Sequence, residues 1–303
     1  MKKTAYSVRR KVKDTTSDKI LYTAIHVLMV FVLIITLYPL IYVVSASFSS
    51  AEAVSSGKVV LFPVDFSVRG YQEVFKYKAV WRGYGNTIFY TVVGTSINIA
   101  MTLCAAFALS KKTLPGRKFF TFMFTFTMLF SGGTIPTYLQ YRNLGILNTR
   151  WALLLPGAIS VYNMIVTRTF ISNIPHELCE AAEIDGCSDA QYFFSILLPL
   201  SKAIIAVIAL YYAVGHWNSY FNAMLYISKQ ELQPLQIFLR DILVLNNIDP
   251  SSITDPELLK ALEGMRDLLK YSLIVVATAP ILCVYPMIQK YFAQGVMVGS
   301  LKG

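Results

Sequence analysis

Long apolar stretches separated by short polar ones run through the whole chain. Each is at least as long as the roughly 20 residues that an α-helix needs to cross a hydrocarbon core, and they lie at about 21–46, 86–109, 118–139, 151–171, 202–227 and 268–290. Several contain helix-breaking residues in their interiors, among them Gly132, Gly133, Pro136, Pro156, Pro280 and Pro286. Such residues are tolerated where neighbouring helices satisfy the freed backbone groups, so the pattern predicts a packed bundle of membrane spans.

Composition supports the same class of protein. Hydrophobic residues make up 55% of the 303 residues and charged residues 15%, against about 25% charged in ordinary globular proteins. This composition excludes intrinsic disorder, and four cysteines without a CxxC pair exclude a disulfide scaffold. The predicted fold is therefore an all-α integral membrane protein with six transmembrane helices.

Basic residues in the connections predict the orientation of the spans. Seven lysines and arginines precede the first span, and the 110–117 connection holds Lys111, Lys112 and Arg117, so both segments should face the cytoplasm. The predicted organisation is a basic tail at 1–20, a six-span domain at 21–290 and a second cytoplasmic tail at 291–303 in a plasma membrane. Because the net charge of +10 is explained by this topology, no nucleic-acid partner is expected.

The loop at 172–201 departs from that rule, since it would be cytoplasmic yet holds five acidic residues and no Lys or Arg. Pro175 suits a first helical turn, and Gly186 suits a left-handed helix end. Ser188 and Gln191 have the spacing of a capping box. The loop is therefore predicted to be a helix–turn–helix. An amphipathic hairpin on lipid headgroups is the alternative, although such helices usually carry basic residues.

The residues of this loop resemble the EAA loop of ABC-importer permeases: Glu180, Ala181, Ala182, Gly186, Ile196, Leu198 and Pro199. Asn86-Thr87, Trp217-Asn218 and a glycine-containing C-terminal tail extend the resemblance to carbohydrate-uptake permeases of the LplC/YtcP type. One departure is Ser219, where the family often has an acidic residue.

The resemblance implies an ABC type I importer permease fold and a function. The chain would form a translocation path for oligosaccharides with a sister permease, and an extracytoplasmic solute-binding protein would deliver the cargo. Two ATPase subunits would carry the ATP and Mg and would receive the 172–201 loop as coupling helices. Glu180 would pair with a basic residue of the ATPase, Gly186 would permit the bend, and Asp185 belongs to the same coupling set.

The chain has no sequence of the form GxxxxGK[ST], so it is not expected to hydrolyse ATP. We also expect no catalytic residues, no metal site and no cofactor on this chain. Two rival functions make different demands on the sequence. A self-contained secondary transporter or channel would need internal repeats and buried acids, and a membrane-embedded enzyme would need clustered catalytic groups. Neither pattern is found in the sequence.

The fifth span supplies the candidates for a substrate path: Tyr211, Trp217, Asn218, Tyr220 and Asn222. Tyr211, Asn218 and Asn222 are spaced to share one face of a helix. Polar groups inside a bundle face either a cavity or another helix, and both interpretations remain open here. For Asn98 and Asn163, bonding between helices is favoured.

The segment at 228–267 is long for a connector and should be external. Its second half predicts a helix running into the sixth span with one apolar stripe: Leu258, Leu259, Leu262 and Met265. Two roles are open for it, a dock for the solute-binding protein or a cover over the external mouth.

Overall fold

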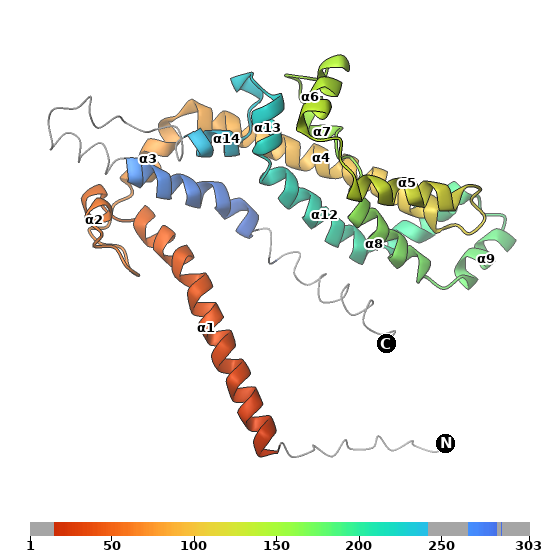
Figure 1. Ribbon diagram of the computed structural model, residues 1–303, viewed down its shortest axis with the longest axis horizontal. Helices are drawn as coiled ribbons and strands as arrows, with labels where there is room; N and C mark the ends of the chain where they lie inside the picture. The colour runs from red at the N-terminus through yellow and green to blue at the C-terminus, as the bar shows by residue number, and fades with distance from the viewer. Residues whose placement is uncertain (1–14, 242–265, 284–285, 287–303) are drawn as a thin grey trace.

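The computed structural model describes residues 15–241, 266–283 and 286, and the described part is helical without β-strands. Figure 1 shows the arrangement. The helices named in the figure are α1 (Thr16–Ser47), α2 (Ala51–Ser55), α3 (Arg69–Lys76), α4 (Lys78–Ser110), α5 (Arg117–Leu129), α6 (Thr134–Asn143), α7 (Trp151–Leu154), α8 (Val161–Ser172), α9 (Glu177–Ile184), α12 (Lys202–Trp217), α13 (Phe221–Tyr226) and α14 (Leu235–Arg240).

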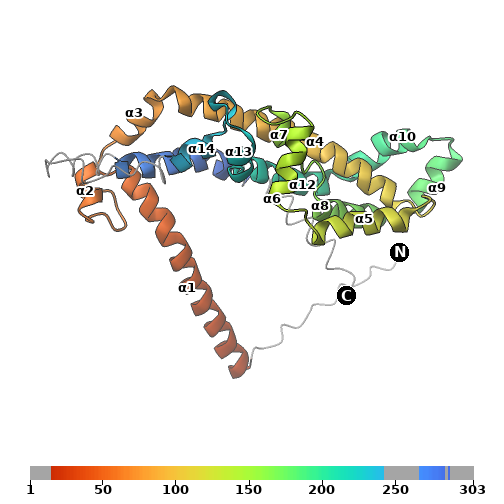
Figure 2. The same cartoon turned by 45° about the horizontal axis from the view of Figure 1, so that its top comes forward.

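Helix α1 confirms the first predicted span as one uninterrupted helix. It begins with a capping box in which Thr15 and Asp18 bond each other's backbone N–H groups. It projects away from the other helices (Figures 1 and 2). Only Ser45, Ala46 and Ser47, at its C-terminal end, are buried. An apolar helix with this little protein contact needs lipid or another protein around it.

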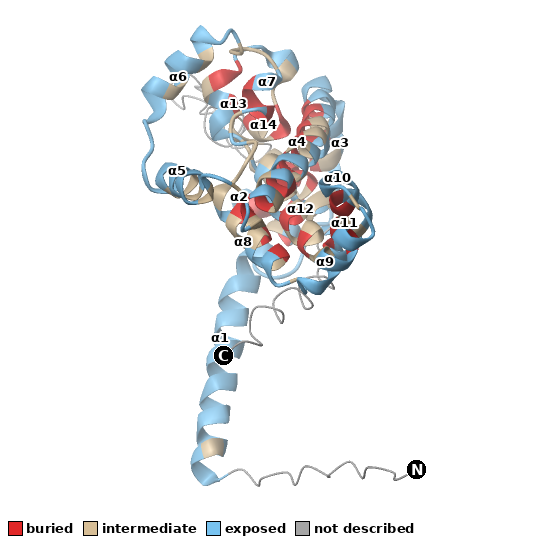
Figure 3. Ribbon diagram, turned by 90° about the vertical axis from the view of Figure 1, so that its right-hand side faces the viewer, coloured by how far each residue is buried: buried red, intermediate tan, exposed pale blue. Residues whose placement is uncertain are grey.

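Helix α4 confirms the second predicted span and lies at the centre of the molecule. It packs along α12 and α8, and α14 contacts its N-terminal half. Figure 3 shows buried residues concentrated around α4, α8 and α12, while α1 is exposed. Gly94 lets α4 approach α12 closely, because a Cβ at this position would overlap the His216 ring.

The third and fourth predicted spans are not single helices. Helices α5 and α6 meet at an angle of 117°, because Gly133 adopts φ +86°, where a glycine has no steric penalty. The break predicted within 118–139 is therefore confirmed at Gly132 and Gly133, while Pro136 lies inside α6. In 151–171, α7 ends at Leu154 and α8 begins only at Val161, with Pro156 and the left-handed Gly157 in between.

The fifth and sixth predicted spans are only partly confirmed. A continuous helix over 202–227 is wrong, since α12 ends at Trp217 and α13 begins at Phe221. Residues 266–283 form one helix that includes Pro280. Among the described residues, two helices alone could cross a membrane by length and apolarity, and up to four segments could do so if each of two bent pairs counts as one.

Several predictions fall on residues that the structure does not describe. They are the basic tail before residue 15, the apolar stripe of the external segment at Leu258, Leu259, Leu262 and Met265, and the C-terminal tail at 291–303.

Candidate functional site

The acidic loop at 172–201 folds as the predicted helix–turn–helix, and α9 lies at one end of the molecule (Figure 1). Helix α9 begins two residues after Pro175, so the proline precedes the first helical turn and does not belong to it. The His176 carbonyl accepts hydrogen bonds from the N–H groups of Cys179 and Glu180 at 2.9 and 3.1 Å. The start of α9 is thus held by backbone bonds and has no side-chain cap.

Gly186 ends α9 as predicted, with φ +74°. The N–H of Gly186 donates to the Glu183 carbonyl at 3.1 Å, and the N–H of Cys187 donates to the Ala182 carbonyl at 2.9 Å. These two bonds form a Schellman motif, which requires a left-handed residue at the position of Gly186. No atom lies within 4 Å of a Cβ built on Gly186. Backbone conformation, not lack of space, therefore favours glycine here.

The predicted capping box is also present. The Ser188 N–H donates to Gln191 Oε1 at 2.9 Å, and the Gln191 N–H donates to Ser188 Oγ at 3.3 Å. The following helix runs through Asp189–Gln191, a π-helical turn at Tyr192–Leu197 and Leu198–Leu200. The wide turn directly precedes Pro199, which lacks an N–H and clashes with the carbonyl four residues earlier in an α-helix. This helix meets α12 at 81°.

The loop is attached to the bundle through buried aromatic side chains. Phe107, near the end of α4, contacts the Phe193 and Tyr192 rings at centroid distances of 5.2 and 6.2 Å. Ala182 is the buried residue of α9 and joins the same cluster. Lys111 of the 110–117 connection forms an ion pair with Asp189. The acidic loop therefore packs against the basic connection, a contact that the sequence analysis did not predict.

The predicted coupling residues divide into an anchored group and an exposed group. Ala182 is buried and Ile196 and Leu198 are half-buried against the core. The exposed residues are Glu180, Ala181, Asp185, Gly186 and Pro199. The Glu180 carboxylate lies 3.1 Å from His176 Nδ1, and 63% of its side chain is exposed. The exposed part of the loop therefore presents carboxylates and small residues to a partner.

Burial and nearby carboxylate change the chemistry of one thiol on α9. Burial raises the pKa of Cys179, and a hydrogen bond to the Glu183 carboxylate together with its negative charge raises it further. Cys179 is therefore more fully protonated at neutral pH than an exposed cysteine, which makes it a weak nucleophile.

The candidate substrate-path residues do not form the single helical face predicted for them. Tyr211 lies on α12, Asn218 follows its last residue and Asn222 lies on α13, so the helix break separates them. These three residues and Tyr220 are exposed. Trp217 is buried instead, and its indole N–H donates to the Ala277 carbonyl at 2.9 Å. In this structure Trp217 joins α12 to the helix at 266–283.

A buried polar cluster that the sequence analysis did not assemble joins α4, α12 and the break between α7 and α8. Asn98 Nδ2 donates to the carbonyls of Gly157 and Ala158 at 3.1 and 2.9 Å, and His216 Nε2 lies 2.6 Å from Asn98 Oδ1. The Tyr212 hydroxyl lies 2.6 Å from Thr102 Oγ1 and accepts the Ser160 N–H at 3.0 Å. Asn98 therefore bonds between helices, as favoured, and satisfies two backbone carbonyls in the break between α7 and α8.

In the described part of the chain, no group of three or more His, Cys, Asp or Glu side chains is placed to hold a metal ion. The buried polar cluster supplies hydrogen bonds between helices, and the exposed part of the 172–201 loop supplies a surface to which a partner protein can bind.

Comparison with known proteins agrees with this architecture of broken membrane helices and a protruding helix pair. Residues 11–298 match the family described as binding-protein-dependent transport system inner membrane component. Because the match spans nearly the whole chain, the protein belongs to this family of membrane transport permeases, which are not enzymes. Membership of this family is inconsistent with the rival interpretation of the chain as a self-contained secondary transporter or channel.

Two relatives come from Bacillus subtilis (strain 168). The polygalacturonan/rhamnogalacturonan transport system permease protein YtcP is 42% identical over 276 residues, covering 91% of this chain and 96% of YtcP. Protein LplC is 42% identical over 269 residues, covering 89% of this chain and 90% of LplC. The chain is thus similar over most of its length to a polygalacturonan/rhamnogalacturonan transport system permease protein.

A solved structure is similar over the same extent. A chain of a bacterial ABC transporter involved in the import of the acidic polysaccharide alginate superposes with a TM-score of 0.84 at 36% identity, covering 93% of this chain and 100% of that chain. The predicted fold class, an all-α membrane protein with the ABC importer permease fold, is confirmed, and so is the resemblance that the EAA residues carried. The family implies ATPase and solute-binding partners.

Proposed function

We propose that this chain is the membrane-spanning permease subunit of an ABC importer for oligosaccharides. It forms the translocation path together with a sister permease in a heterodimer, and two ATPase subunits bind the ATP and Mg. Both termini and the 172–201 loop face the cytoplasm. The similarity to YtcP and to the alginate importer supports polysaccharide fragments as cargo.

One observation carries the coupling role of the loop. Helix α9 is anchored through Ala182 while Glu180, Ala181 and Asp185 of the same segment are exposed. A helix fixed on one side and exposed on the other can transmit a rigid-body displacement from a docked partner to the bundle. An exposed carboxylate next to small residues fits a cleft with basic side chains, so Glu180 is proposed to pair with a basic residue of the ATPase subunit.

Alternating access then follows from the way the loop is connected. The helix at 189–200 leads directly into α12, and α12 packs along α4. Movement of the coupling helices when the ATPase pair closes would therefore tilt α12 and α4 together. The exposed residues Tyr211, Asn218, Tyr220 and Asn222 are the candidates for contact with the passing sugar.

The charge reversal Glu180→Lys tests the coupling role. We expect it to abolish co-purification of the ATPase subunits and to stop transport, because like charges would face each other in the cleft, while membrane insertion of the chain stays normal. Glu177→Lys is the matched control, since Glu177 is also exposed and on α9 but outside the coupling set. Retained co-purification and transport in Glu180→Lys would refute the assignment.

A further inference from the structure

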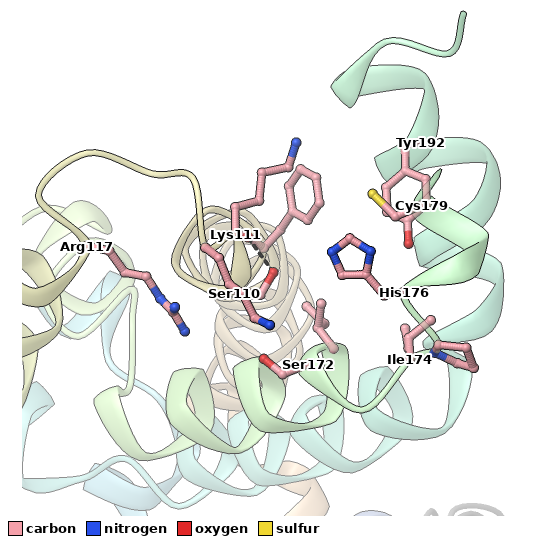
Figure 4. Close-up of a pocket in the computed structure, with 12 residues that line it drawn as sticks. Ser110, Lys111, Arg117, Ser172, Ile174, His176, Cys179 and Tyr192 are labelled. Atoms are coloured by element: carbon pink, nitrogen blue, oxygen red, sulfur yellow. Dashed lines mark hydrogen bonds between the residues drawn. The ribbon is translucent and has the colours of Figure 1, made fainter. Parts of the chain in front are cut away.

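A basic pocket lies between the end of α4 and the start of the acidic loop. Its volume is about 340 Å³, and its walls come from the end of α4, the 110–117 connection, the end of α8 and the start of α9. Figure 4 shows Ser110 and Arg117 on one side of the pocket and His176 and Cys179 on the other. The volume lies within the range of about 300–1,000 Å³ that is typical of small-molecule sites.

The Lys and Arg side chains that line this pocket give it a basic wall, while carboxylates lie next to three of the lining residues: Asp189 at Lys111, Glu180 at His176 and Glu183 at Cys179. Lys111, Lys112 and Arg117 line it, and no carboxylate is among the lining residues. Lys111 is already engaged by Asp189 and by the Phe107 ring. In the described part of the chain Lys112 has no partner, and Arg117 uses only its Nε, which donates to the Leu109 carbonyl at 2.9 Å. The Lys112 ammonium and the terminal nitrogens of Arg117 are therefore available to an anion.

A hydroxyl group adds a further donor. Ser172 lines the pocket, and its hydroxyl has no hydrogen-bond partner within the described residues. His176 also lines it, but its Nδ1 is already engaged by the Glu180 carboxylate at 3.1 Å. Two available basic groups and a hydroxyl together suit an oxyanion with several acceptor oxygens.

The position of the pocket relates it to the membrane surface. Helices α4 and α8 both end at its walls, at Ser110 and Ser172, so it lies at the level where membrane-crossing segments meet the headgroup region. A second, mainly apolar pocket of about 230 Å³ shares Ile174 and Pro175 with it. An apolar recess beside a basic one matches the two ends of a phospholipid.

We infer that this pocket binds a phosphate group, carried either by the headgroup of an anionic phospholipid or by a free phosphate. Lys112 and Arg117 supply the charge and Ser172 supplies a hydrogen bond. The bound phosphate would bridge the 110–117 connection and the end of α8. Binding at this site does not depend on the role of Glu180, so the two proposals can fail separately.

The test uses the full-length chain in nanodiscs. In one arm the discs contain phosphatidylcholine with a minor share of phosphatidylglycerol, and native mass spectrometry counts the phosphatidylglycerol retained by each chain. In the other arm the discs contain phosphatidylcholine alone, and equilibrium dialysis measures bound inorganic phosphate. Lys112→Gln is the test variant, and Lys112→Arg should bind like the native chain. Lys118→Gln, an exposed lysine outside the pocket, is the matched control.

We expect Lys112→Gln to weaken binding about five-fold, which corresponds to the ~1 kcal/mol that one basic residue contributes near an anionic surface. Lys118→Gln should leave binding unchanged. Retention of phosphatidylglycerol with this pattern supports a headgroup site, and the same pattern with inorganic phosphate alone supports a site for a free phosphate. Equal effects of Lys112→Gln and Lys118→Gln, or no binding of either probe, would overturn the inference.

Discussion

At the residue scale, the parts of this protein that could be predicted from sequence are those fixed by neighbours along the chain. The Ser188–Gln191 capping box and the left-handed Gly186 were both predicted, because each depends on residues within a few positions. The bond between Asn98 and His216 joins residues 118 positions apart. No local pattern pairs two such residues, and only the packing of α4 on α12 brings them together.

Gly94 gives the clearest test of that packing. Gly94→Ala should destabilise the protein by about 1–3 kcal/mol, because the added methyl group must displace the His216 ring from its bond to Asn98. Gly85→Ala is the matched control: Gly85 lies on the same helix, and nothing is within 4 Å of a Cβ built there. It should stabilise the helix by up to ~1 kcal/mol. Thermal unfolding in detergent measures both, and equal effects would contradict the close contact.

At the element scale, the apolar pattern located the membrane segments but not the shapes of their helices. Each predicted segment that proved discontinuous contains or adjoins a left-handed glycine, a proline or a polar run: Gly133, Pro156, Gly157 and the stretch at 218–220. The same residues can kink a helix or end it, and the outcome depends on whether a neighbour bonds the freed backbone. Asn98 does this for Gly157 and Ala158. That compensation is tertiary, so sequence periodicity could not reveal it.

The turn between the coupling helices has its own prediction. Gly186→Ala should cost about 1–2 kcal/mol locally, because a non-glycine residue resists the left-handed conformation. The strain should shift the relative angle of the two helices and reduce substrate-stimulated ATPase activity of the assembled importer. Gly145→Ala is the matched control, since Gly145 has φ +68° and equally open surroundings in the 140–150 connection. Equal activity in both variants would show that the turn does not govern coupling.

At the scale of the whole molecule, charge and apolar surface are distributed in a way that the isolated chain does not explain. Helix α1 exposes apolar side chains along most of its length, and the tip of the acidic loop exposes Ile184 at 86%. Lipid can cover the first surface. Lipid does not suit the second, because acidic residues surround Ile184 and anionic membranes would repel them. A protein partner at the loop could bury Ile184 and also place basic side chains next to the acidic residues.

This surface predicts a labelling pattern, which we would measure in a variant whose four cysteines are replaced by serine. Ile184→Cys should react with a membrane-impermeant maleimide in inside-out vesicles and should be protected when the ATPase subunits assemble. Leu144 is 63% exposed in the 140–150 connection, which lies on the external side if successive spans alternate in direction from a cytoplasmic N-terminus. Leu144→Cys should react in intact cells and should be insensitive to the ATPase. Both side chains are exposed in the isolated chain. A difference in their labelling therefore reports the side of the membrane and the docking of the ATPase, not local burial. Reaction of Ile184→Cys in intact cells would reverse the proposed topology, and the coupling role would fail with it.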